Sequence, residues 1–168
     1  MIVLGIDPAL TSLGWGVIDS NKGQIYHIAS GIIKTLSSEL LHKRLHRIAV
    51  DLNKIIDVHK PDIVAMEETF INMNAVSSMK LCYARGVVMS LVGSYPEITF
   101  QEFKPNLIKK TVVGAGRADK QQIVHMMRLL LRLDQAALGQ FDQADALAVA
   151  YTSIIFSSNK FNMTDEKS

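Results

Sequence analysis

The stretch Met1-Ile2-Val3-Leu4-Gly5-Ile6-Asp7-Pro8 opens the chain and decides the expected fold. A short apolar run that is partly β-branched and is followed by an acid and a proline is typical of a buried strand ending in a turn. Asp7 is therefore expected at the carboxyl end of the first strand. Two further strands are expected at 14–19 and 25–33, joined by a turn at Asn21-Lys22-Gly23. The chain thus begins as hairpin-linked strands.

A second acid follows a second buried strand. Residues 40–58 place apolar side chains at helical spacing, with Lys43, Arg44, Arg47 and Lys54 interleaved, which predicts an amphipathic helix. The apolar strand 63–66 then ends in Glu67-Glu68. Strand–helix–strand connections favour parallel neighbours, so Asp7 and one of these glutamates are expected at the same end of the sheet. Because adjacent strand residues point to opposite faces, the residues alone leave the choice of glutamate open.

The rest of the chain is predicted to be mainly helical. Helices are expected at 75–92, 106–113, 119–133 and 140–156, and a fifth strand at 98–100. The helix at 75–92 is apolar on most faces, so we expect it to be buried or to face a second copy of the chain. Together these elements predict an α/β fold of the ribonuclease H-like type, a five-stranded mixed sheet flanked by helices. We expect one nuclease domain, 1–156, and a polar, disordered tail, 157–168.

The last predicted helix carries two more acids. Asp142 and Asp145 are three residues apart in its first turn and so share one helical face. With Asp7 and one glutamate they give four carboxylates that are expected to converge. Such an oxygen-rich set, without a Cys or His ligand pattern, suits Mg²⁺ or Mn²⁺ rather than zinc. Two such ions would serve phosphodiester hydrolysis, which is nuclease chemistry.

Each acid also has a simpler explanation when it is taken alone. Asp7 before Pro8 is a common turn arrangement, and a pair of glutamates suits a solvated strand end. Asp142 and Asp145 would complement a helix dipole. The joint arrangement, with acids at two strand ends and at one helix start, is less readily explained in this way.

Charge and composition narrow the class of protein. The net charge of +2 hides a segment, 104–132, whose only acid is Asp119, and this segment suits either a solvated face or a polyanionic partner. With 168 residues the chain is expected to bury one core and is short for two domains. Its single cysteine, Cys82, cannot close an intramolecular disulfide. We find no secretion signal and no uninterrupted membrane-spanning run, and therefore expect a soluble cytoplasmic protein.

These residues resemble the RuvC family of Holliday junction resolvases over about 1–153. The resemblance is carried by Leu4-Gly5-Ile6-Asp7-Pro8, Ala65-Met66-Glu67 with Phe70, Lys109-Lys110-Thr111-Val112-Val113-Gly114, Ala118-Asp119-Lys120 and Asp142-Gln143-Ala144-Asp145-Ala146-Leu147-Ala148. It implies a homodimeric, Mg²⁺-dependent crossover junction endodeoxyribonuclease that makes paired symmetric nicks in four-way DNA junctions during recombination and repair. It also implies the RuvA and RuvB branch-migration proteins as partners. By position, the family's catalytic, metal-binding acids are matched by Asp7, Glu67, Asp142 and Asp145.

The resemblance also implies contacts with DNA. Lys109 and Lys120 match basic positions near the scissile phosphate, and Phe70 matches an aromatic residue thought to stack on junction bases. A core position is an equally good alternative for Phe70. We expect the DNA-binding surface to include the other basic residues of this region, Lys104, Lys110 and Arg117. The helix at 75–92 corresponds to the family's dimer-contacting region.

The first turn departs from the family pattern. The family usually has Gly after Asp-Pro, whereas this chain has Ala9-Leu10-Thr11. Because Ala resists backbone angles that Gly tolerates, the sequence leaves the conformation of this turn open.

Three other functions fit parts of the sequence. A different ribonuclease H-like nuclease, acting on ribosomal RNA precursor, would use the same acids and basic segment. A noncatalytic DNA-binding module would use the basic segment alone. A phosphotransferase related to actin and the sugar kinases also begins with an apolar strand and Gly-Ile-Asp, but such proteins enclose a nucleotide between two domains, and this chain has the length of one.

Overall fold

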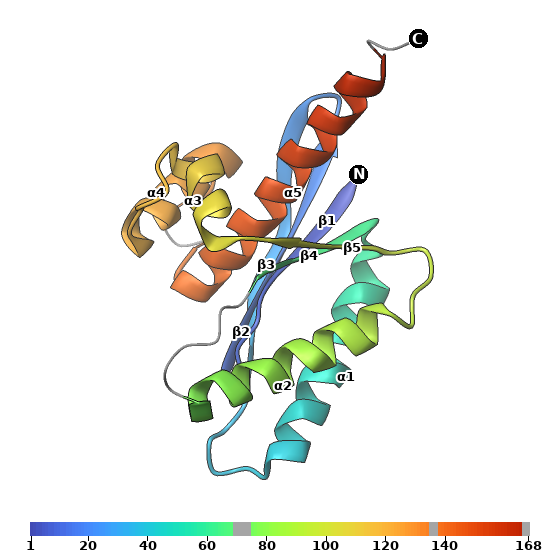
Figure 1. The fold of residues 1–168 in the computed structure, drawn as a ribbon, viewed down its shortest axis with the longest axis vertical. Coiled ribbons are helices and arrows are strands. Elements are labelled where there is room, and N and C mark those ends of the chain that lie inside the picture. The colour runs from blue at the N-terminus through green and yellow to red at the C-terminus, as the bar shows by residue number, and fades with distance from the viewer. Residues whose placement is uncertain (69–74, 135–137, 166–168) are drawn as a thin grey trace.

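The computed structural model describes residues 1–68, 75–134 and 138–165, which form one mixed sheet with helices on both faces (Figure 1). The strands β1 (Ile2–Asp7), β2 (Ser12–Asn21) and β3 (Gln24–Lys34) pair antiparallel in succession. The strands β4 (Ile63–Glu67) and β5 (Thr99–Phe103) extend the sheet in parallel beyond β1. The order β3-β2-β1-β4-β5 confirms the expected five-stranded mixed sheet.

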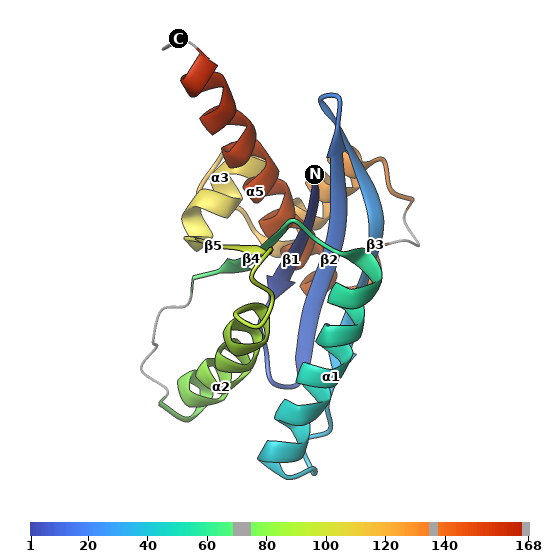
Figure 2. The same ribbon diagram turned by 90° about the vertical axis from the view of Figure 1, so that its right-hand side faces the viewer.

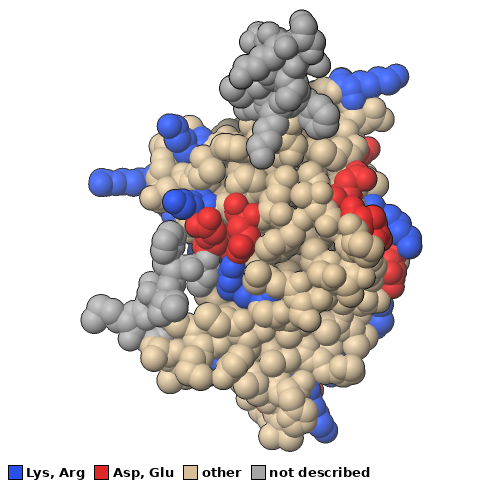
Figure 3. Space-filling view, turned by 45° about the vertical axis from the view of Figure 1, so that its right-hand side comes forward, with Lys and Arg blue, Asp and Glu red and all other residues tan. Residues whose placement is uncertain are grey.

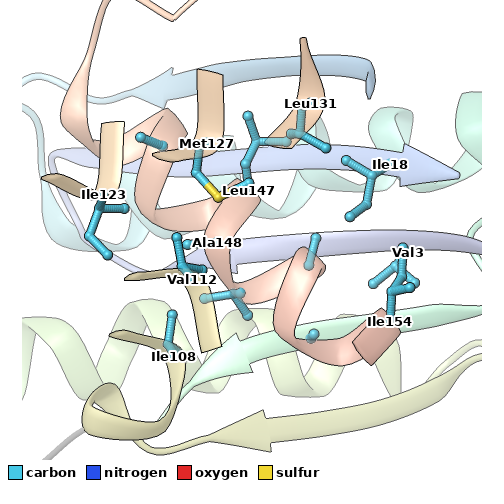
Figure 4. Packing of buried hydrophobic residues seen from close by; sticks show 14 of the residues in the cluster. Val3, Ile18, Ile108, Val112, Ile123, Met127, Leu131, Leu147, Ala148 and Ile154 are labelled. Atoms are coloured by element: carbon cyan, nitrogen blue, oxygen red, sulfur yellow. The ribbon is translucent and has the colours of Figure 1, made fainter. Parts of the chain in front are cut away.

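The helices divide between the two faces of the sheet (Figures 1 and 2). One face is covered by α1 (Leu41–His59) and α2 (Ala75–Val92), and the other by α3 (Pro105–Val113), α4 (Lys120–Leu131) and α5 (Phe141–Asp165). Figure 4 shows Leu147 of α5 and Met127 of α4 packed together in the core on the α5 side, to which Val3 of β1 also belongs. The two cores hold the central strands between helical layers, so β1 and β4 are buried on both faces.

Glycine at two points lets α5 lie directly against the sheet. A Cβ on Gly5 would be 2.0 Å from the carbonyl oxygen of Ala146, and a Cβ on Gly14 would be 2.0 Å from that of Asp142. No side chain fits at these positions, because the backbone of α5 already occupies the space. The first turns of α5 are therefore held against β1 and β2, beside the carboxyl end of β1.

The helix boundaries follow the sequence pattern closely, with one clear difference at the carboxyl end. The polar segment after Phe156, expected to be a disordered tail, continues α5 as far as Asp165. Its residues permit a helix once the apolar first half of α5 is fixed on the sheet, since propagation costs less than nucleation.

Asp119 lies just before α4, where its side chain and that of Gln122 form a reciprocal capping box.

The turn that follows β1 does not require glycine. Among the described residues, the non-glycine residues with positive φ are Lys22, Lys60 and Arg132. Ala9 therefore adopts a backbone conformation that alanine tolerates, and the departure from the family pattern introduces no backbone strain at this position.

The helix α2 is only partly buried, although its sequence is apolar on most faces. Ser78, Ala84, Val88 and Val92 are its buried residues, and the last three belong to the core between the sheet and α1. Its exposed large apolar side chains are Val76, Met79, Tyr83 and Met89. By length and composition alone, α2 is also the one described helix apolar enough to cross a membrane, a test that core helices of soluble proteins pass as well. The exposed side of α2 is thus an apolar surface without a covering element in the described part of the chain.

Candidate active site

Two acids lie at the ends of neighbouring parallel strands. Asp7 ends β1 and Glu67 ends β4, and each directly follows the last paired residues of these two strands, Ile6 and Met66. On β1, Val3 contributes to the core on the α5 side and Ile6 to the core on the opposite side. By alternation, Asp7 projects toward α5.

The same alternation separates the two adjacent glutamates. Ala65 packs on the α5 side of the sheet and Met66 on the α2 side. Glu67 therefore projects to the face that Asp7 shares, and Glu68 to the other face. The backbone N–H of Glu68 donates to the carbonyl oxygen of Phe103, the last residue of β5, at 2.8 Å. The backbone hydrogen bonding to β5 therefore extends one residue past the end of β4. The geometry thus agrees with Glu67 rather than Glu68 as the partner of Asp7.

The first turns of α5 bring Asp142 and Asp145 to this end of the sheet. The hydroxyl of Ser12, at the start of β2, donates to Oδ2 of Asp142 at 2.5 Å. The ammonium of Lys120, at the start of α4, lies 3.5 Å from Oδ2 of Asp145. Three elements from distant parts of the sequence thus meet around the two aspartates.

The acids interact electrostatically across the site. Burial, followed by repulsion from Asp145, Glu67 and Asp142, raises the pKa of Asp7 to about 8. Burial and then Asp145 raise the pKa of Glu67. Burial also raises the pKa of Asp145, although Lys120 opposes the shift. The four carboxylates therefore occupy one electrostatic neighbourhood in which full ionisation is costly.

Three basic side chains reach this neighbourhood. Lys109 and Lys120 both lower the pKa values of Glu67 and Asp145 relative to what burial alone would give. The third is Arg85 of α2, which donates to the carbonyl oxygen of Glu67 and pairs with Glu102 of β5. The sequence reasoning did not single out Arg85. The available signal was its position between Ala84 and Gly86 in a largely apolar helix, because a charge in such a setting needs a partner.

The remaining predicted DNA-binding residues differ in their placement. Lys104 lies immediately before α3, Lys110 in its last turn and Arg117 in the loop before α4, and all three are exposed. Within the described residues, no interaction links these three to the four acids. Phe70 lies outside the described residues.

In the view of Figure 3, basic side chains border a compact acidic patch, and much of the lower part of this face is uncharged.

The donor set fits a divalent metal by its chemistry. All four side chains offer carboxylate oxygens, the ligands that hard cations prefer, and their mutual repulsion is the kind that bound cations relieve. As the side chains stand, no three Asp, Glu, His or Cys residues in the described part of the chain are close enough together to enclose an ion. The residues present thus match a metal site in donor type and charge. In this arrangement the described carboxylates are not close enough together to enclose an ion, and the ammonium of Lys120 is paired with Asp145.

Comparison with known proteins gives a consistent family. Residues 3–153 match the model of the family described as crossover junction endodeoxyribonuclease RuvC. The chain is 53% identical to a protein of that name from Rickettsia bellii (strain RML369-C) over 155 residues, which cover 92% of this chain and 98% of the relative. A structure of Thermus thermophilus RuvC superposes with a TM-score of 0.85 at 29% identity, covering 95% of this chain and 97% of that one. The T. thermophilus protein in complex with Holliday junction substrate gives 0.86 at 28% identity, covering 94% of each chain.

Proposed function

This chain belongs to the RuvC family of crossover junction endodeoxyribonucleases, and from that premise we propose that it resolves Holliday junctions. It makes paired symmetric nicks in four-way DNA junctions during recombination and repair. The observation that supports this most directly is that Asp7 and Glu67 end neighbouring parallel strands on the side of the sheet that α5 covers, where half-buried Asp145 of α5 acts on both through its charge. The arrangement is suited to phosphodiester hydrolysis, because carboxylates collected at a sheet edge are the protein's part of a metal-assisted nuclease site.

Family membership implies a divalent metal ion, and we identify it as Mg²⁺, for which Mn²⁺ can substitute. Asp7, Glu67, Asp142 and Asp145 would hold it. A bound divalent ion supplies an activated water and stabilises the charge that develops on the phosphate oxygens. The oxygen-only donor set supports this identification, because zinc sites usually include Cys or His.

The chain's own residues position and neutralise the phosphate. Lys109 and Lys120 are placed so that each acts on both Glu67 and Asp145 through its charge. We assign them to the scissile phosphate, where a nearby ammonium stabilises the negative charge that grows as the bond breaks. The exposed residues Lys104, Lys110 and Arg117 are assigned to phosphates farther along the DNA, since their contribution is to affinity rather than to the reaction. Phe70 is assigned to base stacking on the strength of its position in the family motif alone.

The active form is assigned as a homodimer. The exposed apolar side of α2, formed by Val76, Met79, Tyr83 and Met89, supports this, because an isologous interface buries the same patch of both copies. A four-way junction presents two equivalent strands related by a two-fold axis. A symmetric dimer places one carboxylate site at each strand, so that both nicks come from one complex.

The cellular setting follows from the substrate. We place the protein in the cytoplasm, where it acts on DNA, and Cys82 is consistent with this location because it is a free thiol. RuvA and RuvB branch-migration proteins are assigned as partners from the family resemblance. The described surface does not by itself identify where they would bind.

A nicking assay on defined substrates tests the proposed function. The purified protein is incubated with a synthetic four-way junction, with a linear duplex of the same sequence and with a structured RNA, each with Mg²⁺ or with EDTA. We expect symmetric nicks in the junction alone, and only with the metal. Cleavage of the RNA in preference to the junction would instead favour a ribosomal RNA precursor nuclease, and ATP hydrolysis without nicking would favour the phosphotransferase alternative.

A further inference from the structure

Arg44 of α1 is a charged residue whose side chain is buried. Its exposed fraction is 6%. It lies one helical turn before Ile48, in the buried row that continues through Leu52 and Ile56. Positions four apart share a helical face, so this row extended backward by one turn includes Arg44. Lys43, Arg47 and Lys54 are not among the buried residues of α1.

The guanidinium of Arg44 holds together three parts of the chain. Its Nε donates to Oγ1 of Thr35 at 2.9 Å, just after β3. One terminal nitrogen donates to Oγ1 of Thr11 at 2.9 Å and approaches the carbonyl oxygen of Leu10 at 3.4 Å. Arg44 thus ties α1 and the end of β3 to the turn between β1 and β2.

Stability alone is a poor explanation for a cation at this place. In the described part of the chain Arg44 has no ion-pair partner, and its hydrogen-bond acceptors are neutral. It also lies in the first turn of α1, where the helix dipole disfavours positive charge. Burying an unpaired charge is costly, so a neutral side chain of similar size would be the more stable choice.

The groups that Arg44 contacts do not depend on it for hydrogen bonding. The hydroxyl of Thr35 donates to the carbonyl oxygen of Leu10 at 2.6 Å, and its backbone N–H donates to the carbonyl oxygen of Thr11 at 3.1 Å. The side chain of Thr11 is exposed to water. Removing the guanidinium would therefore leave these groups satisfied. What it would remove is the rigid fork that fixes their relative positions.

The turn held by Arg44 connects two residues of the active site. It begins directly after Asp7 and ends at Ser12, whose hydroxyl holds Asp142. We propose that Arg44 is a positioning residue for the nuclease site, clamping this turn so that Asp7 and Asp142 are held ready for the metal. This inference rests on the proposed function, and it adds a residue of α1, on the far side of the sheet from α5, to the apparatus of the site.

The test compares Arg44→Met with Arg47→Met. Arg47 lies on the same helix, its side chain is 53% exposed and it pairs with Glu39, so it controls for loss of an arginine from α1. We expect Arg44→Met to melt, without metal, at or above the wild-type temperature. Its Mg²⁺ affinity, measured by calorimetry on the free protein, should fall roughly 10-fold, the lower end of the effect of losing a group that contacts a metal ligand directly. Single-turnover nicking of a saturating junction should fall with it, while Arg47→Met matches the wild type in all three measurements.

A second variant covers the case in which Arg44→Met does not fold. Thr11→Val removes the exposed acceptor of the clamp and leaves the buried charge in place, so it should fold and should weaken Mg²⁺ binding by a smaller factor. Wild-type metal affinity in either folded variant would overturn the proposal. So would a loss of nicking that followed the loss of thermal stability with metal affinity unchanged. If the wild-type protein itself failed to nick junctions, the proposed function would fail, but the calorimetric comparison would still decide the role of Arg44.

Discussion

The hydroxyl of Ser12 donates a hydrogen bond to Oδ2 of Asp142, joining the start of β2 to the first turn of α5. Ser12 is separated from Asp142 by most of the chain, and nothing in the sequence pairs the two. The contact fixes one oxygen of a carboxylate that we assign to metal binding. A hydroxyl in this position selects one orientation of the acid before the metal arrives.

Replacing Ser12 by alanine should therefore weaken metal binding more than folding. We expect Ser12→Ala to lower the free energy of unfolding by about 1 kcal/mol, the usual value for one hydrogen bond. The Mg²⁺ concentration that gives half-maximal nicking should rise roughly 10-fold. A Mg²⁺ titration of single-turnover rates checks this, with Ser20→Ala at the other end of β2 as the control. An unchanged titration curve would show that Asp142 needs no support from Ser12.

Removing any one of the four acids should nearly abolish cleavage while junction binding persists. Asp7→Asn, Glu67→Gln, Asp142→Asn and Asp145→Asn each lose an anionic ligand, but the basic surface that binds phosphates remains. Gel-shift and nicking assays on the same junction measure the two properties separately. Glu68→Gln is the matched control, because this residue projects to the other face of the sheet. A variant of the four that nicks near the wild-type rate at saturating Mg²⁺ does not belong to the site.

The raised pKa of Asp7 predicts how the stability of the metal-free protein depends on pH. The folded state holds the proton up to about pH 8, whereas the unfolded chain releases it near 3.8. Between these values the folded state binds more protons than the unfolded one, so stability decreases as pH rises. Thermal unfolding in EDTA should thus show a melting temperature that falls from pH 5 to pH 8.

Two further measurements identify Asp7 as the source of that slope. Asp7→Asn cannot ionise, so it should flatten the dependence and melt above the wild type at pH 8. Glu97→Gln, which removes an exposed acid, should leave the slope unchanged. Saturating Mg²⁺ should flatten the wild-type curve as well, because a cation offsets the repulsion among the carboxylates. If the melting temperature of Asp7→Asn still fell with pH, titrating groups other than Asp7 would cause the dependence.

Lys109 and Lys120 should contribute to the rate beyond their contribution to binding. Lys120 lies 3.5 Å from Oδ2 of Asp145, and both lysines act on Glu67 and Asp145. Their alanine variants should lose roughly 10² in single-turnover rate at saturating junction, as expected for a group that stabilises developing charge. Lys110→Ala removes an exposed neighbour and should affect affinity alone. If all three variants kept the wild-type single-turnover rate, Lys109 and Lys120 would contribute only to phosphate binding.

Much of this site could be predicted from the sequence because its acids lie where regular patterns end. The apolar runs before Asp7 and Glu67 predict strand ends, and the spacing of Asp142 and Asp145 predicts a shared helical face. The choice of Glu67 over Glu68 came from the family resemblance. Alternation along β4 supports this choice. Ala65 packs on the side of the sheet that α5 covers, and Glu67, two residues later, projects to the same side.

The supporting residues could not be predicted in this way. Arg44 lies four residues before Ile48, in line with the buried row, but helical spacing alone does not predict that a charged side chain is buried there. The roles of Arg85 and Ser12 depend on contacts between segments that only the tertiary fold brings together. The helix continues past Phe156, which the sequence does not predict because polar composition suits both a tail and the solvated end of a helix.

The exposed side of α2 provides the last test, which concerns assembly. Val88 is fully buried and packs on the sheet side of α2, so a charge there would damage the fold rather than report on a dimer. Met79 is 53% exposed, so Met79→Glu should fold normally. If α2 forms the two-fold interface, the substitution buries an unpaired glutamate from each copy in it, and the cost of desolvating these charges opposes association.

We therefore expect Met79→Glu to sediment as a monomer at micromolar concentration, with a circular dichroism spectrum like that of the wild type. Val58→Glu, which places the same charge at a 74% exposed apolar residue of α1, should leave the wild-type dimer intact. The monomer should also lose coordinated double nicking of a junction, since each encounter then brings one carboxylate site to one strand. Sedimentation of the wild type as a monomer, both free and bound to the junction, would exclude the dimer. In that case the two nicks would have to come from successive binding events, and the apolar side of α2 would need another occupant.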